Sequence, residues 1–412
     1  MAKGNNIDYR KWHKKNLILQ IIRSNPNPSR SSVKEMSGLS MESVLQYIDE
    51  LLQENLIVQA GISASAVGRK ATMLQINPFG AYFIGIKFNA IQLTGIVMDF
   101  GGDIIRQKQI DFPTQVEVQT VIDAVLVCIQ DLLDSLSVEK NKVKGIGIGV
   151  PGYVDSASGI ASLYVHIRNW KDIPLRKIVE DRFGLRTYIE QSVKVTALAL
   201  KLDPENQNIR DMLYILVGRG VGMVIIANNE ICSGHNNGAG EIGHVFVTDN
   251  GQLCECGKLG CLETEAGQNV ILKKLTAGLH AGRHPVLRVL LKDNKAPTVG
   301  DFVQSIELGD PDSVQLMQQL CLYLGRAVAN AVTLLSPHKI IFSGEITRAP
   351  GFIDAIRAEI ETRCPANSIK SMVLQARNNE DSFNARGAAM LAYSSQYGTG
   401  DGTGNRADPS RV

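Results

Sequence analysis

The sequence lacks the features of membrane, secreted and disordered proteins. No run of about 18 apolar residues is free of breaks or charges, so no transmembrane helix is expected. The first residues are basic, but no apolar core follows them as in a secretory signal. With 44% hydrophobic and 20% charged residues among 412, the composition excludes long disorder, collagen and low complexity for most of the chain. We therefore expect a cytoplasmic globular protein of two or three domains.

The cysteines also argue against a disulfide framework, because their number, seven, is odd. Three of them, Cys254, Cys256 and Cys261, lie close together and follow His244. One imidazole and three thiolates suit a closed tetrahedral zinc site, and the glycines among them permit the turns that such spacing needs. A closed shell predicts a structural ion with no position for an activated water. The alternative is a group of reduced structural cysteines.

The charge is uneven along the chain. Residues 1–80 carry ten Lys or Arg against six Asp or Glu, whereas the remainder is slightly acidic. The same segment predicts three short helices, with a glycine turn at 37–40 before the third, and then a hairpin. That order is typical of a winged helix-turn-helix, whose third helix enters the major groove of DNA. The alternative is a small helical packing domain that binds no nucleic acid.

The predicted DNA contacts lie at the start and on the outer side of the third helix and at the tip of the wing. Gln46 is suited to adenine and Glu42 to cytosine, while wing cations suit phosphates or a narrow minor groove. The third helix has no Lys or Arg on its outer side, so we expect weak binding by one head and a need for a dimer. The full predicted set is Ser40, Glu42, Ser43, Gln46, Tyr47, Arg69 and Lys70.

The remaining chain repeats one order of elements: hairpin, third strand, helix, strand. The first copy ends with the strand that finishes at Val150, and the second ends with the strand at 339–344. This predicts a duplicated, two-lobed α/β body with a ligand cleft between the lobes. We expect a head at 1–78, a first lobe at 79–195 to which a helix at 382–396 can return, and a second lobe at 196–381. The Gly-rich tail at 397–412 is expected to be disordered.

Several motifs resemble those of the ROK family of repressors, open reading frames and sugar kinases. The strongest is the stretch 238–267 that holds the cysteines. Weaker matches are GIGIGVPGYVDSASG at 145–159, GRGVG at 218–222, SPHKIIFSG at 336–344 and ARGAAMLA at 385–392. The resemblance covers roughly residues 10–395 and is to the repressor branch with an N-terminal winged helix-turn-helix, as in xylose and N-acetylglucosamine repressors.

The resemblance implies an actin-like, hexokinase-like body, which is a duplicated ribonuclease H-like fold, with a sugar or sugar phosphate between its lobes. Glu241 and Glu263 match the family's sugar-contacting carboxylates, and His244 matches its zinc-bound histidine. Carboxylates suit vicinal hydroxyls, and a bound metal fixes the ring and tautomer of the histidine. Asn169, in the NW segment at 169–170, matches the segment that crosses the sugar site.

The chain departs from the family's kinases at each catalytic position. Gln191 and Ser192 stand where the kinases carry Asn and the Asp that is the general base, and a Ser without help cannot take a hydroxyl proton near pH 7. Lys87 stands at the Asp of the first phosphate loop, and Arg219 replaces the Thr of the second. Gln191 and Ser192 can still bond hydroxyls, while Lys87 and Arg219 suit an anion.

These observations predict a repressor rather than an enzyme. The head would bind double-stranded operator DNA as a homodimer or homotetramer, and the body would sense a sugar-type effector that changes operator affinity. A second interpretation keeps DNA binding but uses a degenerate sugar site for dimerisation or for docking a partner. A third, a sugar kinase with a vestigial head, conflicts with the missing base and phosphate loop.

Overall fold

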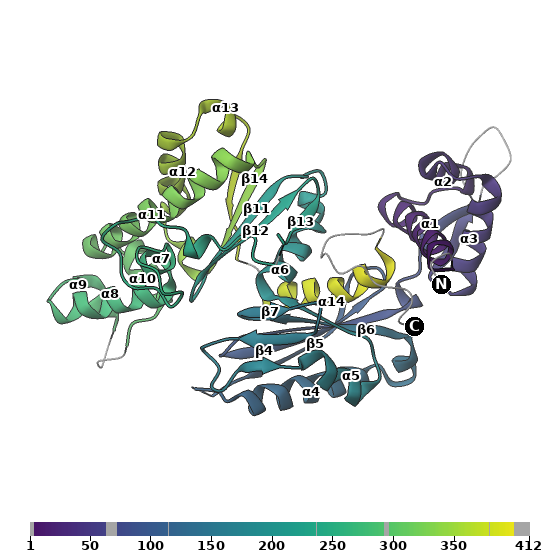
Figure 1. The fold of residues 1–412 in the computed structure, drawn as a ribbon, viewed down its shortest axis with the longest axis horizontal. Coiled ribbons are helices and arrows are strands. Elements are labelled where there is room, and N and C mark those ends of the chain that lie inside the picture. The colour runs from purple at the N-terminus through teal and green to yellow at the C-terminus, as the bar shows by residue number, and fades with distance from the viewer. Residues whose placement is uncertain are drawn as a thin grey trace. The chain divides into compact units, whose positions relative to one another are not determined.

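The computed structural model describes residues 4–62, 72–113, 115–235, 237–291, 296–378 and 380–398 (Figure 1). The chain forms two compact units. The first unit comprises residues 1–200 and 380–412, and the second comprises residues 201–379. The chain leaves the first unit after residue 200 and re-enters it at residue 380.

The first unit begins with three helices and a two-stranded hairpin. Ser40 caps the third helix, where its Oγ accepts a bond of 3.3 Å from the backbone N–H of Ser43. The second helix ends at Gly38, whose φ of 66° permits the turn between the two. These elements are α1 (Gly4–Ser24), α2 (Arg30–Ser37), α3 (Met41–Gln53), β1 (Ile57–Ile62) and β2 (Thr72–Ile76).

The head has an apolar core of its own. Its buried side chains come from all three helices and from both strands of the hairpin, and they include Ile18, Val33, Val44, Tyr47, Ile48, Leu51, Ile57 and Leu74. The antiparallel pairing of Ile57 with Ile76 closes the hairpin. The predicted winged helix-turn-helix is therefore present.

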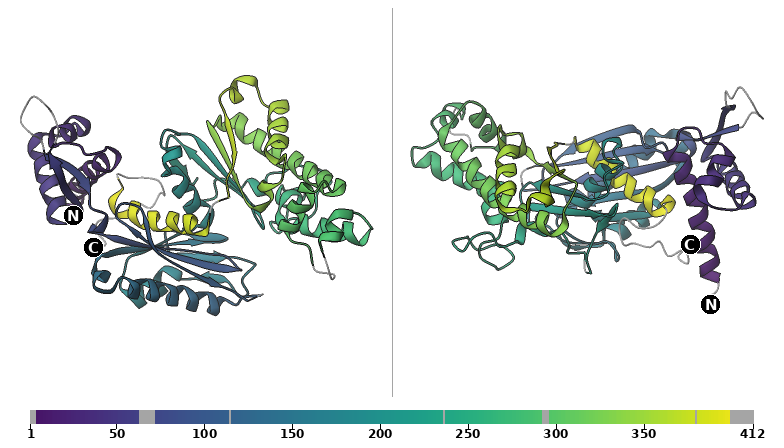
Figure 2. Two further views of the ribbon diagram at one scale, coloured as in Figure 1. Left: turned by 180° about the vertical axis from the view of Figure 1, so that it is seen from behind. Right: turned by 90° about the horizontal axis from the view of Figure 1, so that it is seen from above.

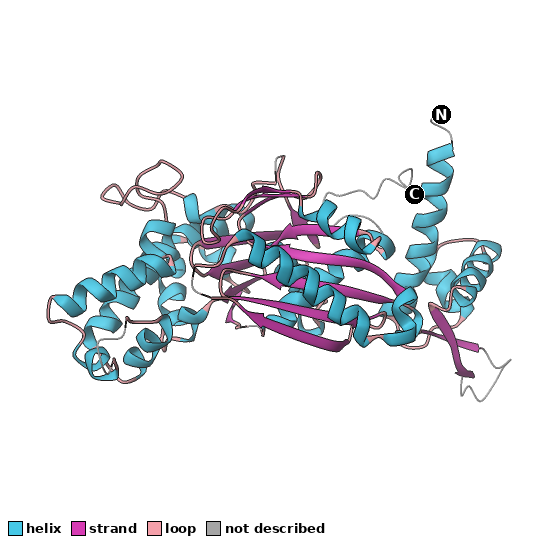
Figure 3. Cartoon of the chain, turned by 90° about the horizontal axis from the view of Figure 1, so that it is seen from below, coloured by secondary structure: helices cyan, strands magenta, loops and turns pink. Residues whose placement is uncertain are grey.

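A five-stranded sheet of order β10-β6-β3-β4-β5 forms the centre of the first unit. Helix α4 contacts β3, β4 and β5, whereas α14 contacts β3, β4, β6 and β10. Figure 2 shows α14, in yellow, on the face opposite α4, and Figure 3 shows helices crossing in front of the strands. The elements are β3 (Tyr82–Phe88), β4 (Gln92–Asp99), β5 (Ile104–Asp111), α4 (Val118–Ser135), β6 (Val143–Val150), β10 (Thr187–Gln191) and α14 (Asp381–Tyr397).

Two glycines let α14 lie directly on the sheet. A Cβ added to Gly85 in β3 would collide with the carbonyl oxygen of Ala385, and one added to Gly147 in β6 would collide with that of Ala388. The small residues of the ARGAAMLA stretch are the matching surface of the helix. This contact explains why a helix from the end of the chain belongs to the first unit.

The second unit repeats the sheet: its strand order, β15-β14-β11-β12-β13, corresponds strand for strand to β10-β6-β3-β4-β5 of the first unit. The pairing directions also match: β11 is antiparallel to β12 and parallel to β14, as β3 is to β4 and β6. The strands are β11 (Met212–Val217), β12 (Val221–Ala227), β13 (Glu230–Cys232), β14 (Lys339–Ser343) and β15 (Val373–Ala376). The predicted duplication is confirmed.

Each copy also carries elements that the repeat does not contain. In the first unit, a small sheet of β7 (Tyr153–Asp155), β8 (Ile160–Leu163) and β9 (Lys171–Ile173) precedes α5 (Leu175–Phe183), and α6 (Ser192–Lys201) follows β10. In the second, helices follow the zinc-type motif and flank β14, and one of them, α11, is the helix of the repeat itself. They are α7 (Glu263–Ala266), α8 (Gln268–His280), α9 (Pro285–Leu290), α10 (Val299–Glu307), α11 (Pro311–Leu335), α12 (Phe352–Arg363) and α13 (Ala366–Ile369).

None of the helices among the described residues is long and apolar enough to cross a membrane. The Gly-rich tail lies outside the described residues from position 399 onward, and α14 occupies the first of the positions assigned to it.

Candidate functional site

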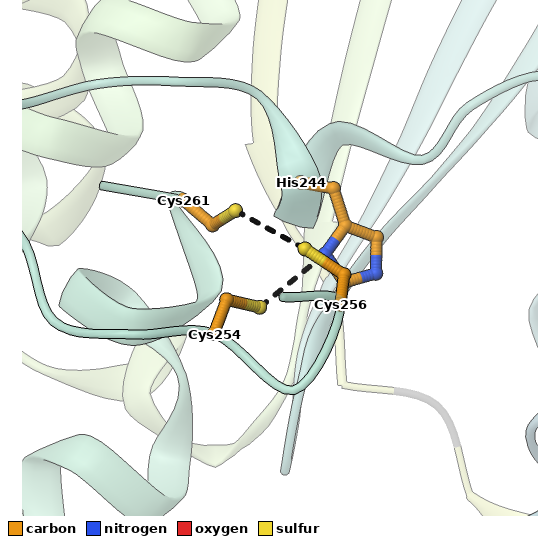
Figure 4. A group of neighbouring side chains, drawn as sticks. All are labelled: His244, Cys254, Cys256 and Cys261. Atoms are coloured by element: carbon orange, nitrogen blue, oxygen red, sulfur yellow. Dashed lines mark hydrogen bonds between the residues drawn. The ribbon is translucent and has the colours of Figure 1, made fainter. Parts of the chain in front are cut away.

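Four side chains of the second unit converge as the motif predicts. Their ligand atoms, from His244, Cys254, Cys256 and Cys261, all lie within 4.8 Å of one another (Figure 4). The Sγ atoms of Cys256 and Cys261 are 3.6 Å apart, as are Cys254 Sγ and His244 Nδ1. A tetrahedral zinc with sulfur ligands at about 2.3 Å has edges of about 3.8 Å, so the donor set fits such an ion.

The local backbone explains how these ligands meet. Leu253 pairs with Leu259 across a tight hairpin, and Phe246 pairs with Cys261 on its other side. Gly257 turns the hairpin with a φ of 81°, which few other residues adopt. The sequence therefore places Cys254 and Cys256 before the turn and Cys261 after it.

Burial makes a cation necessary if these thiols are to ionise. Burial raises the pKa of Cys261 to about 12 and also raises the pKa of Cys254. A backbone N–H from Lys258 lowers the pKa of Cys256. The buried thiols would stay protonated near pH 7 without a positive ion, so the cluster is suited to a dication that binds three thiolates.

Two carboxylates flank this centre. His244 uses Nδ1 on the side of the cysteines, and its Nε2 lies 4.0 Å from Glu241 Oε2. Glu263 Oε2 accepts the backbone N–H of Val221 at 3.2 Å and lies beside Gly243. The structure therefore gathers Glu241, His244 and Glu263 within the second unit, next to the glycine turn that precedes β12.

Arg219 lies in that glycine turn. Its side chain is partly exposed and makes no hydrogen bond or ion pair with any residue that the structure describes. It is a cation available to an anionic ligand.

The other predicted effector residues lie in the first unit. Gln191 ends β10 and Ser192 begins α6, where the carbonyl of Ser192 accepts a hydrogen bond from Thr196 Oγ1. Asn169 is exposed in the turn before β9, with a φ of 62°, and makes no side-chain hydrogen bond in the described part of the chain. The structure shows no contact that joins Asn169 to Gln191 or Ser192.

Sequence analysis missed a pair of charges beside this segment. Lys194 Nζ lies 3.7 Å from Glu190 Oε1, and both side chains are almost completely buried. Glu190 Oε1 also accepts the backbone N–H of Gln191 at 2.8 Å. The spacing of four residues was the available signal, but the sequence did not indicate that both charges are buried.

Lys87, which the sequence assigned to an anion, has a partner within the protein. Its Nζ lies 3.5 Å from Asp381 Oδ1, and Gln92 Nε2 donates to the other oxygen of the same carboxylate. Burial lowers the pKa of Lys87, and the Asp381 charge opposes that effect. Lys87 and Glu190 are both opposite Gly149 of the intervening strand, so the two ion pairs lie where β3, β6 and β10 end.

The outer side of α3 carries uncharged and acidic side chains, as predicted, but one residue assigned to it does not lie there. Glu42 and Gln46 are exposed, but Tyr47 is only 7% exposed and belongs to the core, so its assignment to the DNA-reading side is wrong. Tyr47 lies on the inner face of α3 together with Val44, Ile48 and Leu51. The wing residues Arg69 and Lys70 lie outside the described residues.

Acidic groups of α3 occupy several of the nearby cations. Glu50 lies 3.1 Å from Lys11 and 3.5 Å from Lys15, and it accepts the amide of Gln46 at 3.1 Å. Asp49 lies 3.7 Å from Arg30. Exposed cations without a described partner remain on α1 and α2, namely Arg10, Lys14 and Lys34.

Comparison with known proteins agrees with this architecture. The ROK family model matches residues 83–395. The xylose repressor of Bacillus spizizenii is 27% identical over 355 residues, which cover 86% of this chain and 88% of that protein. The DNA-binding transcriptional dual regulator NagC of Escherichia coli is 28% identical over 393 residues, covering 95% and 94%.

Solved structures give the same picture. A ROK family transcriptional regulator, a homolog of the E. coli Mlc protein, superposes with a TM-score of 0.84 at 26% identity and covers 95% of this chain and 98% of its own. A ROK family glucokinase from Streptomyces griseus shares the body fold, with a TM-score of 0.65 at 24% identity over 76% of this chain and 100% of its own. This chain is a member of the ROK family and belongs to its repressor branch.

Proposed function

We propose that this protein is a DNA-binding transcriptional repressor of sugar-metabolism genes that responds to a sugar or sugar phosphate and has lost kinase activity. The observation that carries the proposal is the combination, in one chain, of a head with the helices and hairpin of a winged helix-turn-helix and a ROK body whose segment at the catalytic position of the kinases reads Glu190-Gln191-Ser192. Relatives named xylose repressor and N-acetylglucosamine repressor support it.

Loss of phosphoryl transfer follows from more than the missing base. A kinase needs carboxylates that are free to hold a metal ion at the phosphates. Here Asp381 is bonded to Lys87 and Gln92, and Glu190 is paired with a buried Lys194. We expect no ATP-dependent phosphorylation of any sugar, which a coupled ADP-release assay with a family sugar kinase as positive control would check.

The effector would bind through its hydroxyls beside the metal centre. A zinc ion held by His244 Nδ1 and the three thiolates leaves the Nε2–H directed toward Glu241, where both can bond vicinal hydroxyls. Glu263 supplies a further acceptor from the same unit. Asn169, Gln191 and Ser192 stay predictions as additional contacts.

Arg219 is the residue that would favour a phosphorylated effector, because Lys87 is already paired. We expect Arg219→Glu to weaken binding of a sugar phosphate far more than binding of the corresponding neutral sugar. Thermal shifts with N-acetylglucosamine and its 6-phosphate, for the wild type and Arg219→Glu, test this. Equal losses for the two would contradict an anion-binding role.

Operator recognition would use the exposed side of α3, from Ser40 to Gln46, with phosphates contacted by Arg10, Lys14, Lys34 and the predicted wing cations. A homodimer would match two half-sites about one helical turn apart. Its site of action would be the cytoplasm, where the DNA lies.

Selection of bound fragments from a random duplex pool, followed by fluorescence anisotropy across salt, tests the proposal and identifies the operator in the same experiment. We expect a preferred sequence, a steep salt dependence, and a shift of affinity with one member of a panel that contains xylose and N-acetylglucosamine. Failure to select any sequence would refute DNA regulation.

One observation favours the alternative in which the body docks a partner. Phe246, Leu253 and Leu259, on the hairpin around the metal ligands, are 58%, 71% and 59% exposed. Contiguous apolar patches on a protein surface are typical of interaction sites. A selected operator whose affinity ignores every sugar, together with no sugar-induced thermal shift, would favour this alternative.

A further inference from the structure

The last helix of the first unit ends against the first helix of the head. The final carbonyl groups of any α-helix have no partner within the helix and need donors from elsewhere. At the end of α14 these include the carbonyls of Gln396, Tyr397 and Gly398. Their donors come from side chains of α1, more than 370 positions earlier in the chain.

Three side chains of α1 supply these donors. Trp12 Nε1 donates to the Gln396 carbonyl at 3.1 Å. Asn16 Nδ2 donates to the same carbonyl and to that of Gly398, both at 3.2 Å. Gln20 Nε2 donates to the Tyr397 carbonyl at 2.9 Å and to the hydroxyl of Tyr393 at 3.1 Å.

Arg23 completes the contact through an aromatic cage. Its guanidinium carbon lies 4.4 Å from the ring centre of Tyr393 and 5.4 Å from that of Phe100. The same group donates to the backbone carbonyls of Phe100 and Gly101. A cation stacked on two rings at the carbonyl end of a helix is stabilised both by the rings and by the helix dipole.

These four residues form one stripe of α1. Positions 12, 16, 20 and 23 are four, four and three apart, which is the spacing of a single helix face. Ile18 and Ile22, which are also buried, lie on a different side of α1. We call the stripe together with residues 393–398 and Phe100 the α1–α14 seam.

The opposite end of α14 lies at the degenerate catalytic segment. Its first residue, Asp381, is bonded to Lys87 and Gln92, at the place that corresponds to the first phosphate loop. One continuous helix of 17 residues therefore contacts the former catalytic region at its start and the DNA-binding head at its end.

We propose that the α1–α14 seam fixes the orientation of the DNA-binding head on the first unit, so that Trp12, Asn16, Gln20 and Arg23 are positioning residues for operator binding. This inference rests on the proposed DNA-binding function. Two heads that bind two half-sites act together only while each is held at a defined place, since a loose linkage lowers the effective concentration of the second head. The seam supplies that constraint although none of its four residues lies on the recognition helix.

The test uses the full-length chain with Asn16→Leu and Gln20→Leu combined, which removes the amide donors at nearly constant volume. The control is Gln119→Leu, the same kind of change at an exposed glutamine of α4 whose amide bonds Asp123 of its own helix. We expect selected-operator affinity to fall about 10-fold or more in the seam variant and not in the control. Arg23→Lys, which keeps the charge but loses the planar stacked fork, should give a smaller loss in the same direction.

Amide hydrogen exchange gives a second measurement that needs no DNA. Residues 394–398 should exchange at least several-fold faster in the seam variant than in the wild type, with α3 and α4 unchanged. Unchanged exchange there would overturn the seam even if no operator were ever found, whereas failure of the wild type to bind DNA would refute only the proposed function. Faster exchange with unchanged operator affinity would overturn the positioning role.

Discussion

The buried pair Glu190 and Lys194 allows a quantitative test of how the former catalytic segment is held. Both side chains are 4% exposed or less, and their charged atoms are 3.7 Å apart. Removing one partner of such a pair leaves an uncompensated buried charge, which costs about 3–5 kcal/mol. Removing both charges costs much less, because no ion is then left in the interior.

We therefore expect Lys194→Met and Glu190→Gln each to lower the free energy of unfolding of the first unit by about 3–5 kcal/mol. The double variant should lie within about 1 kcal/mol of the wild type, because the amide still accepts the N–H of Gln191 and no charge is buried. Such a result is a large coupling energy in a double-mutant cycle.

Urea unfolding followed by tryptophan fluorescence isolates this unit. The chain has 2 tryptophans, Trp12 and Trp170, and both belong to the first unit. Trp170 is 2% exposed and reports loss of the sheet core. Single variants within about 0.5 kcal/mol of the wild type would refute the reasoning, as would a double variant whose loss equals the sum of the two.

Three further predictions concern the rest of the molecule. Cys261→Ser should abolish stoichiometric zinc and lower the melting temperature of the second unit, as measured by metal analysis and calorimetry, whereas Cys232→Ser, at an exposed cysteine outside the cluster, should change neither. Burial opposes ionisation of Asp310, but bonds from the backbone N–H groups of Ser313, Leu287 and Val286 outweigh it and lower the pKa of this carboxyl. The stabilisation that the carboxylate gives is therefore present above the ordinary pKa of Asp and is lost as the pH falls through the lowered value. Asp310→Asn should make the stability of the second unit, measured by amide exchange in α11, less dependent on pH in the acid range, and an unchanged dependence would contradict this. Gly147→Ala should displace α14 and destabilise the first unit by about 3 kcal/mol or more, since the added methyl meets backbone rather than a flexible side chain, and a variant that melts like the wild type would show that the helix does not lie on the sheet as described.

The elements that repeat were predictable because their signals are local. Alternating and helical periodicity predicted a hairpin, a third strand, a helix and a further strand in each copy, but not β10 or β15, and the spacing of Cys254, Cys256 and Cys261 predicted the metal cluster. The small sheet β7-β8-β9 was not predicted, since its strands of three or four residues are too short to show a period.

The errors came from contacts between distant parts of the chain. The indole of Trp12 bonds a carbonyl of α14 that lies 384 positions away, a partner that no spacing within the first helix indicates. Lys87 was read as an available cation because its partner, Asp381, is 294 positions away. No periodicity within a window of the sequence reports such partners.

The order in which the elements are synthesised has a consequence for quality control of the protein. The first unit lacks α14 until the second unit has been made, because α14 follows residue 379. A nascent or truncated chain therefore exposes the face of β3 and β6 around Gly85 and Gly147, and the donors of its head lack their acceptors at Gln396 to Gly398. Domains generally fold as units during synthesis, starting from the N-terminus. Here the N-terminal unit is completed last, so a prematurely terminated product would carry a DNA-binding head on an unfinished sheet and be a substrate for proteases rather than a competitor at the operator.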